Sequence, residues 1–282
     1  MKANNNSILA TLVLLGTLLF GAAAQAAYVG NLIDFTGGLN TVYATGLAAA
    51  YDSNKNQKTD YTWATLGVGD IVVAILKATK VVSPITGSGG VTDNNYTGEL
   101  TKYLALQVQS KEGNVYTFGA GNTSGWDPFG KLQAGEVLGI WLEGAKDFTV
   151  GHPIFGNKNN SRQDEADMAT DGPLFATFGL DSQAFIGYFS PASLTLSGGL
   201  VVKQNPLGLY WLGVPNPEGG TAHLAIENLN LGGKASLNTD WDFFANDAET
   251  FRVTPEPGTM TALLAMGGAA ALGLALRRRK ES

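Results

Sequence analysis

The chain of 282 residues contains no cysteine. Disulfide bonds, thiolate metal sites and cysteine nucleophiles are therefore excluded, and stability must come from side-chain packing. Histidine is scarce as well, because His152 and His223 are the only two and neither has a zinc-type partner nearby in the sequence. We predict that His152 lies in a turn and that His223 faces solvent from a strand.

Recognisable catalytic motifs are missing from the sequence. There is no Gly-x-Ser-x-Gly elbow, no phosphate-binding glycine loop and no His-Glu-x-x-His pattern. We therefore predict that the protein is not an enzyme and needs no cofactor. A triad assembled from distant serine and aspartate residues stays open, because such a triad leaves no local signature.

Charged residues make up only 15% of the chain, and acidic ones prevail, for a net charge of −6. Five of the cations, Lys2 and residues 277–280, lie in terminal segments that we expect to be removed, so the exported part is more acidic still. An acidic surface repels nucleic acid. Divalent cations and neutral glycans remain compatible partners.

The N-terminus has the pattern of an export signal. Residues 8–20 are apolar and uncharged, and Ala24-Gln25-Ala26 supplies the small-x-small sequence that signal peptidase needs. The sequence predicts a signal helix over residues 1–26, cleaved after Ala26. A retained membrane anchor over residues 8–24 is the alternative.

The C-terminal segment, residues 255–282, combines three features. Pro255, Glu256 and Pro257 precede an apolar run, residues 259–276, which is followed by a basic cluster of Arg277, Arg278, Arg279 and Lys280. As a helix rising about 1.5 Å per residue, this run is about 27 Å long, close to the roughly 30 Å of a bilayer's hydrocarbon core. We predict a transmembrane helix over 259–276, with the basic tail 277–280 held on the cytoplasmic side.

This order of tripeptide, apolar helix and basic tail resembles the PEP-CTERM family of exosortase-sorted bacterial proteins. The resemblance covers only the signal peptide and the C-terminal segment. It implies that an exosortase, an integral membrane cysteine transpeptidase, recognises the tripeptide and removes the C-terminal helix. It also implies a Gram-negative source, an inner-membrane-anchored precursor and a mature form at the cell surface or outside the cell. A simple single-pass membrane-anchored ectodomain is the alternative.

Residues 27–254 are predicted to form a single extracytoplasmic, mainly β domain. Short segments rich in β-branched and aromatic residues alternate with turns, in a chain that holds 37 glycines and 10 prolines. This spacing favours an antiparallel β-sandwich or jelly-roll-like fold, with loops over 52–60 and 152–172. The predicted strands are 28–35, 41–50 (with a helical alternative at 47–50), 61–66, 71–82, 100–109, 115–118, 137–142, 148–150, 174–180, 184–189, 194–202, 208–214, 223–231 and 250–253.

Two acidic segments are candidate Ca²⁺ sites. Residues 52–60 place oxygen-bearing side chains at alternating positions, but Gln57 replaces the usual turn glycine and Trp63 stands where a closing carboxylate belongs. The second candidate offers four carboxylates without a defined loop spacing: Asp164, Glu165, Asp167 and Asp171. An ordinary solvated loop is the alternative for both.

Three tryptophans, Trp126, Trp211 and Trp241, are candidates for sugar binding, because indole rings near polar loop residues offer flat apolar faces. The alternative is that they fill the core. Tyr210 and Trp211 are neighbours, so in a strand they must face opposite sides and one of them is expected at the surface.

Together, these features predict an exported, exosortase-processed surface or extracellular-matrix protein with a structural or adhesive role in exopolysaccharide or biofilm. The predicted partners are exosortase, signal peptidase, the membrane and exopolysaccharide. An exported polysaccharide hydrolase is the alternative, with paired carboxylates drawn from the acidic loop and from Asp242.

Overall fold

The computed structural model describes residues 32–59, 61–92, 99–143, 161–180, 185–234 and 241–255. Strands account for 56% of these residues and helices for 5%, which confirms the prediction of a mainly β domain. The predicted signal peptide, 1–26, and transmembrane helix, 259–276, lie outside the described residues. Across the described ranges, no helix is long and apolar enough to span a bilayer.

The strands are antiparallel, and six of them are longer than the sequence pattern predicts. Within the described residues, one α-helix, α2 (Arg162–Met168), and one 3₁₀ turn, η1 (Trp63–Thr65), accompany them. The strands are β1 (Asn40–Tyr51), β2 (Ile71–Val82), β3 (Val91–Thr92), β4 (Glu99–Glu112), β5 (Val115–Gly119), β6 (Leu138–Glu143), β7 (Leu174–Leu180), β8 (Phe185–Phe189), β9 (Ser193–Gln204), β10 (Leu209–Leu212), β11 (Val214–Pro215), β12 (Thr221–Ala222), β13 (Leu224–Lys234) and β14 (Phe243–Pro255). The six that exceed the prediction are β1, β4, β5, β9, β13 and β14.

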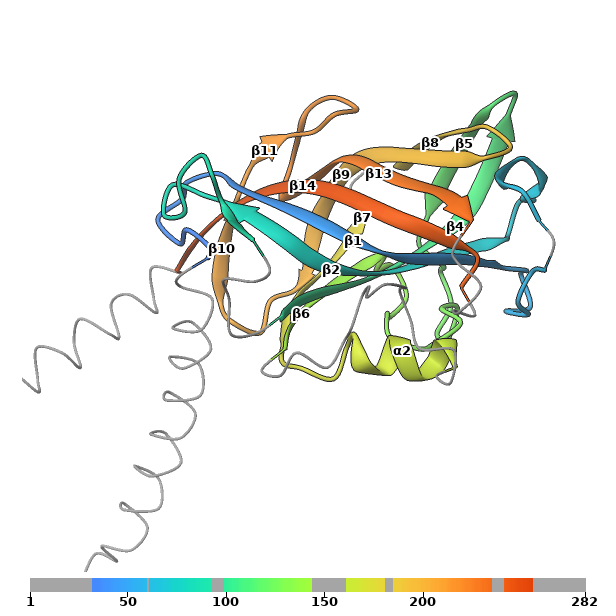
Figure 1. Ribbon diagram of the computed structural model, residues 1–282, viewed down its shortest axis with the longest axis horizontal. Helices are drawn as coiled ribbons and strands as arrows, with labels where there is room; N and C mark the ends of the chain where they lie inside the picture. Colours follow the sequence, from blue (N-terminus) through green and yellow to red (C-terminus); the bar gives the residue numbers. More distant parts are fainter. Residues whose placement is uncertain are drawn as a thin grey trace, which may run out of the picture.

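The main sheet closes on itself (Figure 1). Its ring runs β2, β1, β14, β13, β9, β7, β6, β4, and β4 then pairs with β2 again. Strands β5 and β8 form a second path between β4 and β9, and β10 extends the sheet beside β14. The predicted sandwich of two sheets is not confirmed, because one continuous sheet encloses the core. Alternation of apolar and polar residues along a strand shows which face of the strand is buried. It does not distinguish a two-sheet sandwich from a closed sheet, because both bury the inner face of each strand.

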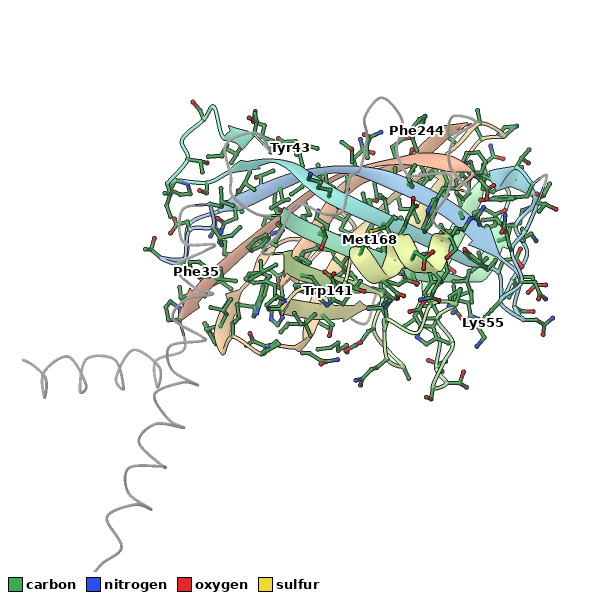
Figure 2. All side chains as sticks on the ribbon, turned by 60° about the horizontal axis from the view of Figure 1, so that its bottom comes forward. Phe35, Tyr43, Lys55, Trp141, Met168 and Phe244 are labelled. Carbon is green, nitrogen blue, oxygen red and sulfur yellow. The ribbon has the colours of Figure 1, made fainter. Side chains whose placement is uncertain are left out.

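The enclosed core and an outer layer bury opposite faces of the same strands. Leu76 of β2 and Leu104 of β4 point into the ring, whereas Ile75 and Tyr103 point outward beneath α2 and the loop after β5. Figure 2 shows α2, with Met168, lying over this outer face. Burial on both faces explains why β2 is an almost unbroken apolar run.

Helix α2 corrects the prediction that residues 152–172 form a loop throughout. Ser161 caps the helix: its Oγ accepts a hydrogen bond from the Asp164 N–H at 3.1 Å, and the Asp164 carboxylate accepts one from the Ser161 N–H at 2.9 Å. The buried side of the helix carries Arg162, Glu165 and Ala166. Ser161 and Asp164 have the spacing of a helix-capping sequence, but the high polarity of the segment favoured the prediction of a loop.

Some local predictions are also wrong. Residues 32–35 and 61–66 do not pair as strands but pack against the enclosed core, where Trp63 is fully buried and its ring centroid lies 4.5 Å from that of Phe243. Residues 47–50 continue β1 rather than forming a helix, and 208–214 divides into β10 and β11. His223 precedes β13, is half-buried, and accepts a hydrogen bond at Nδ1 from the Val202 N–H at 3.2 Å. Segments 28–31 and 148–150 and His152 lie outside the described residues.

Candidate functional site

A lysine and two carboxylates meet inside the closed sheet. Lys102 Nζ, on β4, lies 3.0 Å from Asp247 Oδ2 and 2.9 Å from Glu249 Oε1, both on β14. The side chains of Lys102 and Glu249 are fully buried and that of Asp247 is 2% exposed. These three residues are called the interior charge cluster below.

Strand alternation places the interior charge cluster. Asp247 and Glu249 are two residues apart on β14 and so share its inner face, while Lys102 lies between the inward-facing Leu100 and Leu104 on β4. The residues paired with the cluster on neighbouring strands are apolar: Leu76, Ile140, Ala44, Val42 and Ile226. The charges therefore lie in an environment of low polarity.

Burial dominates the electrostatics of the interior charge cluster. It raises the pKa of Glu249 to about 7, although the charge of Lys102 opposes the shift. Burial alone would lower the pKa of Lys102, but the two carboxylates outweigh it and the pKa lies above its ordinary value. Among the described residues, Asp247 Oδ1 and Glu249 Oε2 have no hydrogen-bond partner. The cluster is thus held by ion pairs and is incompletely satisfied by hydrogen bonds.

The interior charge cluster was not predicted from the sequence, although a signal for it exists. Lys102 interrupts an alternating series of inward leucines on β4, which is the position of a core residue. The hydrophobic alternation along β4 does not predict which strands surround it in the ring. The contact between Lys102 and the carboxylates of β14 therefore could not be predicted from sequence.

The C-terminal strand joins the sheet directly to the Pro-Glu-Pro tripeptide. β10 pairs with the end of β14, and in its register Leu209 is opposite Pro255 and Trp211 is opposite Val253. Val253 is fully buried. The first proline of the tripeptide is therefore the last residue of the sheet.

Residues 253–280 match the family model described as the PEP-CTERM protein-sorting motif. The chain carries a PEP-CTERM motif. This confirms the resemblance at the C-terminal segment and indicates an exported protein that is sorted by an exosortase. No curated protein matches the chain. Within the PEP-CTERM motif, Glu256, Pro257 and the basic cluster 277–280 lie outside the described residues.

The three tryptophans considered for sugar binding are buried. Trp126 and Trp211 are 5% exposed and Trp241 is 3% exposed. Trp211 packs in the enclosed core, and Trp126 and Trp241 lie in the outer layer, where Trp126 Nε1 donates to the Gln133 carbonyl at 3.1 Å. Their placement supports the core-packing alternative, since a sugar ring needs an accessible indole face.

The acidic residues near α2 point to different partners. Asp164 caps the helix, Glu165 accepts a hydrogen bond from Trp241 Nε1, Asp167 lies 2.6 Å from Lys131 Nζ, and Asp171 is exposed. Across the described ranges, no group of three or more histidine or carboxylate side chains is arranged to hold a metal ion. The hydrogen bond from Lys131 holds the pKa of Asp167 below its ordinary value.

The loop at residues 52–59 is a polar turn, as predicted. Asp52 Oδ1 accepts hydrogen bonds from the backbone N–H groups of Asn54 and Asn56 at 2.8 and 2.9 Å. Its Oδ2 accepts another from Asn56 Nδ2 at 3.1 Å. These bonds lower the pKa of Asp52 and turn its carboxylate toward its own loop.

Among the described residues, the exposed aromatic side chains are tyrosines rather than tryptophans. Tyr188 on β8 and Tyr210 on β10 are 58% and 57% exposed, and Tyr43 on β1 is 42% exposed with Lys80 Nζ over its ring at 5.8 Å. The exposure of Tyr210 beside the buried Trp211 confirms the prediction that these neighbours face opposite sides. Sequence alternation alone could not say which of the two would be outside.

Proposed function

We propose that the protein is an exosortase-processed surface or extracellular-matrix component with a structural or adhesive, non-enzymatic role. The observation that carries this proposal is the direct passage from β14 into the PEP-CTERM motif, with Pro255 still paired to Leu209. An antiparallel closed sheet is thereby joined, without an intervening linker, to the segment through which the chain is sorted.

Exopolysaccharide is the proposed partner at the surface. Tyr188 and Tyr210 expose rings that would stack on sugar faces, and the chain's negative charge disfavours polyanionic partners such as nucleic acid. A neutral polysaccharide would stack on the exposed tyrosine rings and would not be repelled by the negative charge of the protein. The proposed role needs no bound cofactor.

The processing part of the proposal is tested by intact mass in the producing organism, with and without its exosortase. We expect the culture supernatant or outer surface to contain a species that starts near Ala27 and ends near Pro255. Deletion of the exosortase should leave a membrane form that retains residues 277–280. If the protein retains residues 277–280 even when the exosortase is present, the C-terminal segment is a simple membrane anchor and the proposal of exosortase sorting is wrong.

The role of the domain is tested with the organism's own exopolysaccharide, immobilised on a column. Retention of the purified mature protein without cleavage of the polymer supports a structural or adhesive role. The double variant Tyr188→Ala/Tyr210→Ala should lose retention, while Tyr43→Ala, whose ring is covered on one side by Lys80, serves as the matched control. Cleavage of the polymer would establish the hydrolase alternative, and absence of retention would contradict exopolysaccharide as the partner.

A further inference from the structure

We propose that the interior charge cluster is a self-modification site at which Lys102 and Asp247 condense into an intramolecular isopeptide bond, with Glu249 carrying the proton. The product would be an amide between Lys102 Nζ and Asp247 Cγ that covalently joins β4 to β14. Neither the sorting motif nor the surface role proposed above requires such a bond.

The reacting groups are already in contact. Lys102 Nζ lies 3.0 Å from an oxygen of Asp247, and side chains from the strands of a closed sheet hold both groups in place. Holding two reactants together in this way corresponds to effective concentrations of about 10⁵ M or more. An amine and a carboxylate that do not react in dilute solution are thus placed in reactive proximity.

Glu249 is suited to move the proton. Its Oε1 lies 2.9 Å from Lys102 Nζ, it follows Asp247 by two residues on the same inner face of β14, and it is fully buried, so it is placed to relay a proton between the attacking nitrogen and the leaving oxygen. Because burial raises the pKa of Glu249 to about 7, a large share of this carboxyl is protonated near neutral pH and can act as a general acid. The nearby charge of Asp247 contributes to raising the pKa of Glu249, so we assign the proton to Glu249 and the role of electrophile, the acceptor of the attacking nitrogen, to the Asp247 carboxyl.

The step balances without an added reactant. The ammonium of Lys102 first passes a proton to the Asp247 carboxylate, which leaves a neutral amine and a carboxylic acid. The Nζ lone pair then attacks Asp247 Cγ, forming the C–N bond and a tetrahedral intermediate. Glu249 protonates the hydroxyl as the C–O bond breaks and water leaves, and it regains a proton from the nitrogen. No oxidation or reduction occurs, and the sum is an ammonium and a carboxylate giving an amide and one water.

The environment favours the product over the ion pair. Buried charges are poorly solvated and their mutual attraction only partly offsets that loss, particularly here, where Asp247 Oδ1 has no hydrogen-bond partner among the described residues. Condensation replaces one positive and one negative charge by a neutral amide. The apolar side chains around the cluster also disfavour the return of water that hydrolysis would need.

The position of the bond suits a cysteine-free exported domain. Lys102 and Asp247 are 145 residues apart in sequence, so one bond would close most of the sheet into a covalent loop. β14 is also the strand that continues into the PEP-CTERM motif. Force applied at an attached C-terminus would then be carried by an amide bond as well as by the strand pairing.

The test is mass spectrometry on the full chain purified under native conditions after expression in a bacterial host. The proposed bond lowers the intact mass by that of one water molecule. After unfolding and trypsin digestion, Lys102 resists cleavage, and a branched peptide joins residues 81–111 to 235–252. Fragmentation of that peptide should place the link between Lys102 and Asp247.

Variants separate the bond from folding. Lys102→Arg keeps the positive charge but should abolish the branched peptide, whereas Lys111→Arg, on the exposed end of the same strand, should retain it. Glu249→Gln should slow bond formation after pulse-labelled synthesis by roughly 100-fold or more, the usual effect of losing a general acid. If a variant fails to fold, the wild-type mass and peptide map still decide the question.

An intact mass equal to that of the linear chain, together with free peptides 81–102 and 235–252, would overturn the proposal. A branched peptide linked through Glu249 would overturn the assignment of Asp247 as acceptor and of Glu249 as proton carrier. Bond formation at the wild-type rate in Glu249→Gln would remove Glu249 from the reaction.

Discussion

Leu209 is paired with Pro255 across β10 and β14, so the sorting tripeptide begins inside the sheet rather than after a linker. Pro255 has no backbone N–H and fixes its own φ near the value of extended chains, which suits the last residue of a strand at the sheet's edge. A peptidase that needs the tripeptide in extended form must therefore act close to the folded domain or wait for the end of β14 to separate from β10.

A flexible linker at this junction should accelerate processing. We expect six Gly/Ser residues inserted between Thr254 and Pro255 to raise the rate of C-terminal cleavage by roughly fivefold, the equivalent of about 1 kcal/mol for one backbone hydrogen bond that no longer has to open. Pulse–chase analysis of precursor and product measures the rate. The same six residues inserted at Gly113, in the turn between β4 and β5, are the control and should leave the rate unchanged. Equal cleavage rates in the two insertion variants would show that the strand end does not limit access.

The neighbours Trp211 and Tyr210 should differ sharply in their effect on stability. Trp211→Ala removes an indole that packs against Phe175, Phe178 and Phe251 in the enclosed core, so the free energy of unfolding should fall by about 3–5 kcal/mol. Tyr210→Ala, on the exposed side of the same strand, should change it by less than about 1 kcal/mol. Urea unfolding followed by circular dichroism measures both. A small effect of Trp211→Ala would contradict its placement in the core.

Arg162 should be the residue of α2 that holds the helix to the sheet. Its guanidinium lies 5.8 Å from the ring centre of Tyr51 and 5.6 Å from that of Trp241, and it donates to Asp242 Oδ2 at 3.2 Å. Arg162→Met should lower the free energy of unfolding by about 2 kcal/mol, as expected for a desolvated cation–π contact. The exposed neighbour Gln163→Met should change it by under about 0.5 kcal/mol. Faster hydrogen exchange in α2 and β1 should accompany only the first variant; its absence would argue against this anchoring role.

Local properties of the chain could be predicted from sequence, whereas relations between distant strands could not. β2 and β4 are marked by runs of β-branched and aliphatic residues, and the opposite exposure of Tyr210 and Trp211 follows from the two-residue period of a strand. The PEP-CTERM motif was readable because its residues are contiguous.

The closure of the sheet and the interior charge cluster depend instead on pairing. The ring closes where β14, the last strand in sequence, pairs with β1, the first, and this pairing is decided by twist and packing summed over many strands. Lys102 approaches Asp247 only because of that closure, since 145 residues separate them in sequence. Trp126 and Trp241 are buried because α2 and neighbouring loops cover the outer face of the sheet. The alternation of residues along a strand does not predict this covering layer.

The pH dependence of stability should report directly on Glu249. Its pKa in the folded protein is about 7, above the ordinary value of 4.5 that it takes when unfolded. Between these values the folded state retains a proton that the unfolded state has lost, so stability falls as the pH rises through this window. The contribution of one group is at most about 1.4 kcal/mol per pH unit. Desolvation is the largest cause of the shift and acts whether or not Lys102 and Asp247 are covalently joined.

Urea unfolding at a series of pH values between 4.5 and about 7 measures this contribution in the wild type and in Glu249→Gln, whose amide is neutral throughout. The wild type should lose stability relative to the variant as the pH rises across the window, because only the wild type must either keep its proton or bury a negative charge in the apolar interior. A stability difference between the two that stays constant, or that grows in favour of the wild type as the pH rises, would mean that Glu249 is charged in the folded protein. It could not then serve as the proton donor for an amide bond between Lys102 and Asp247.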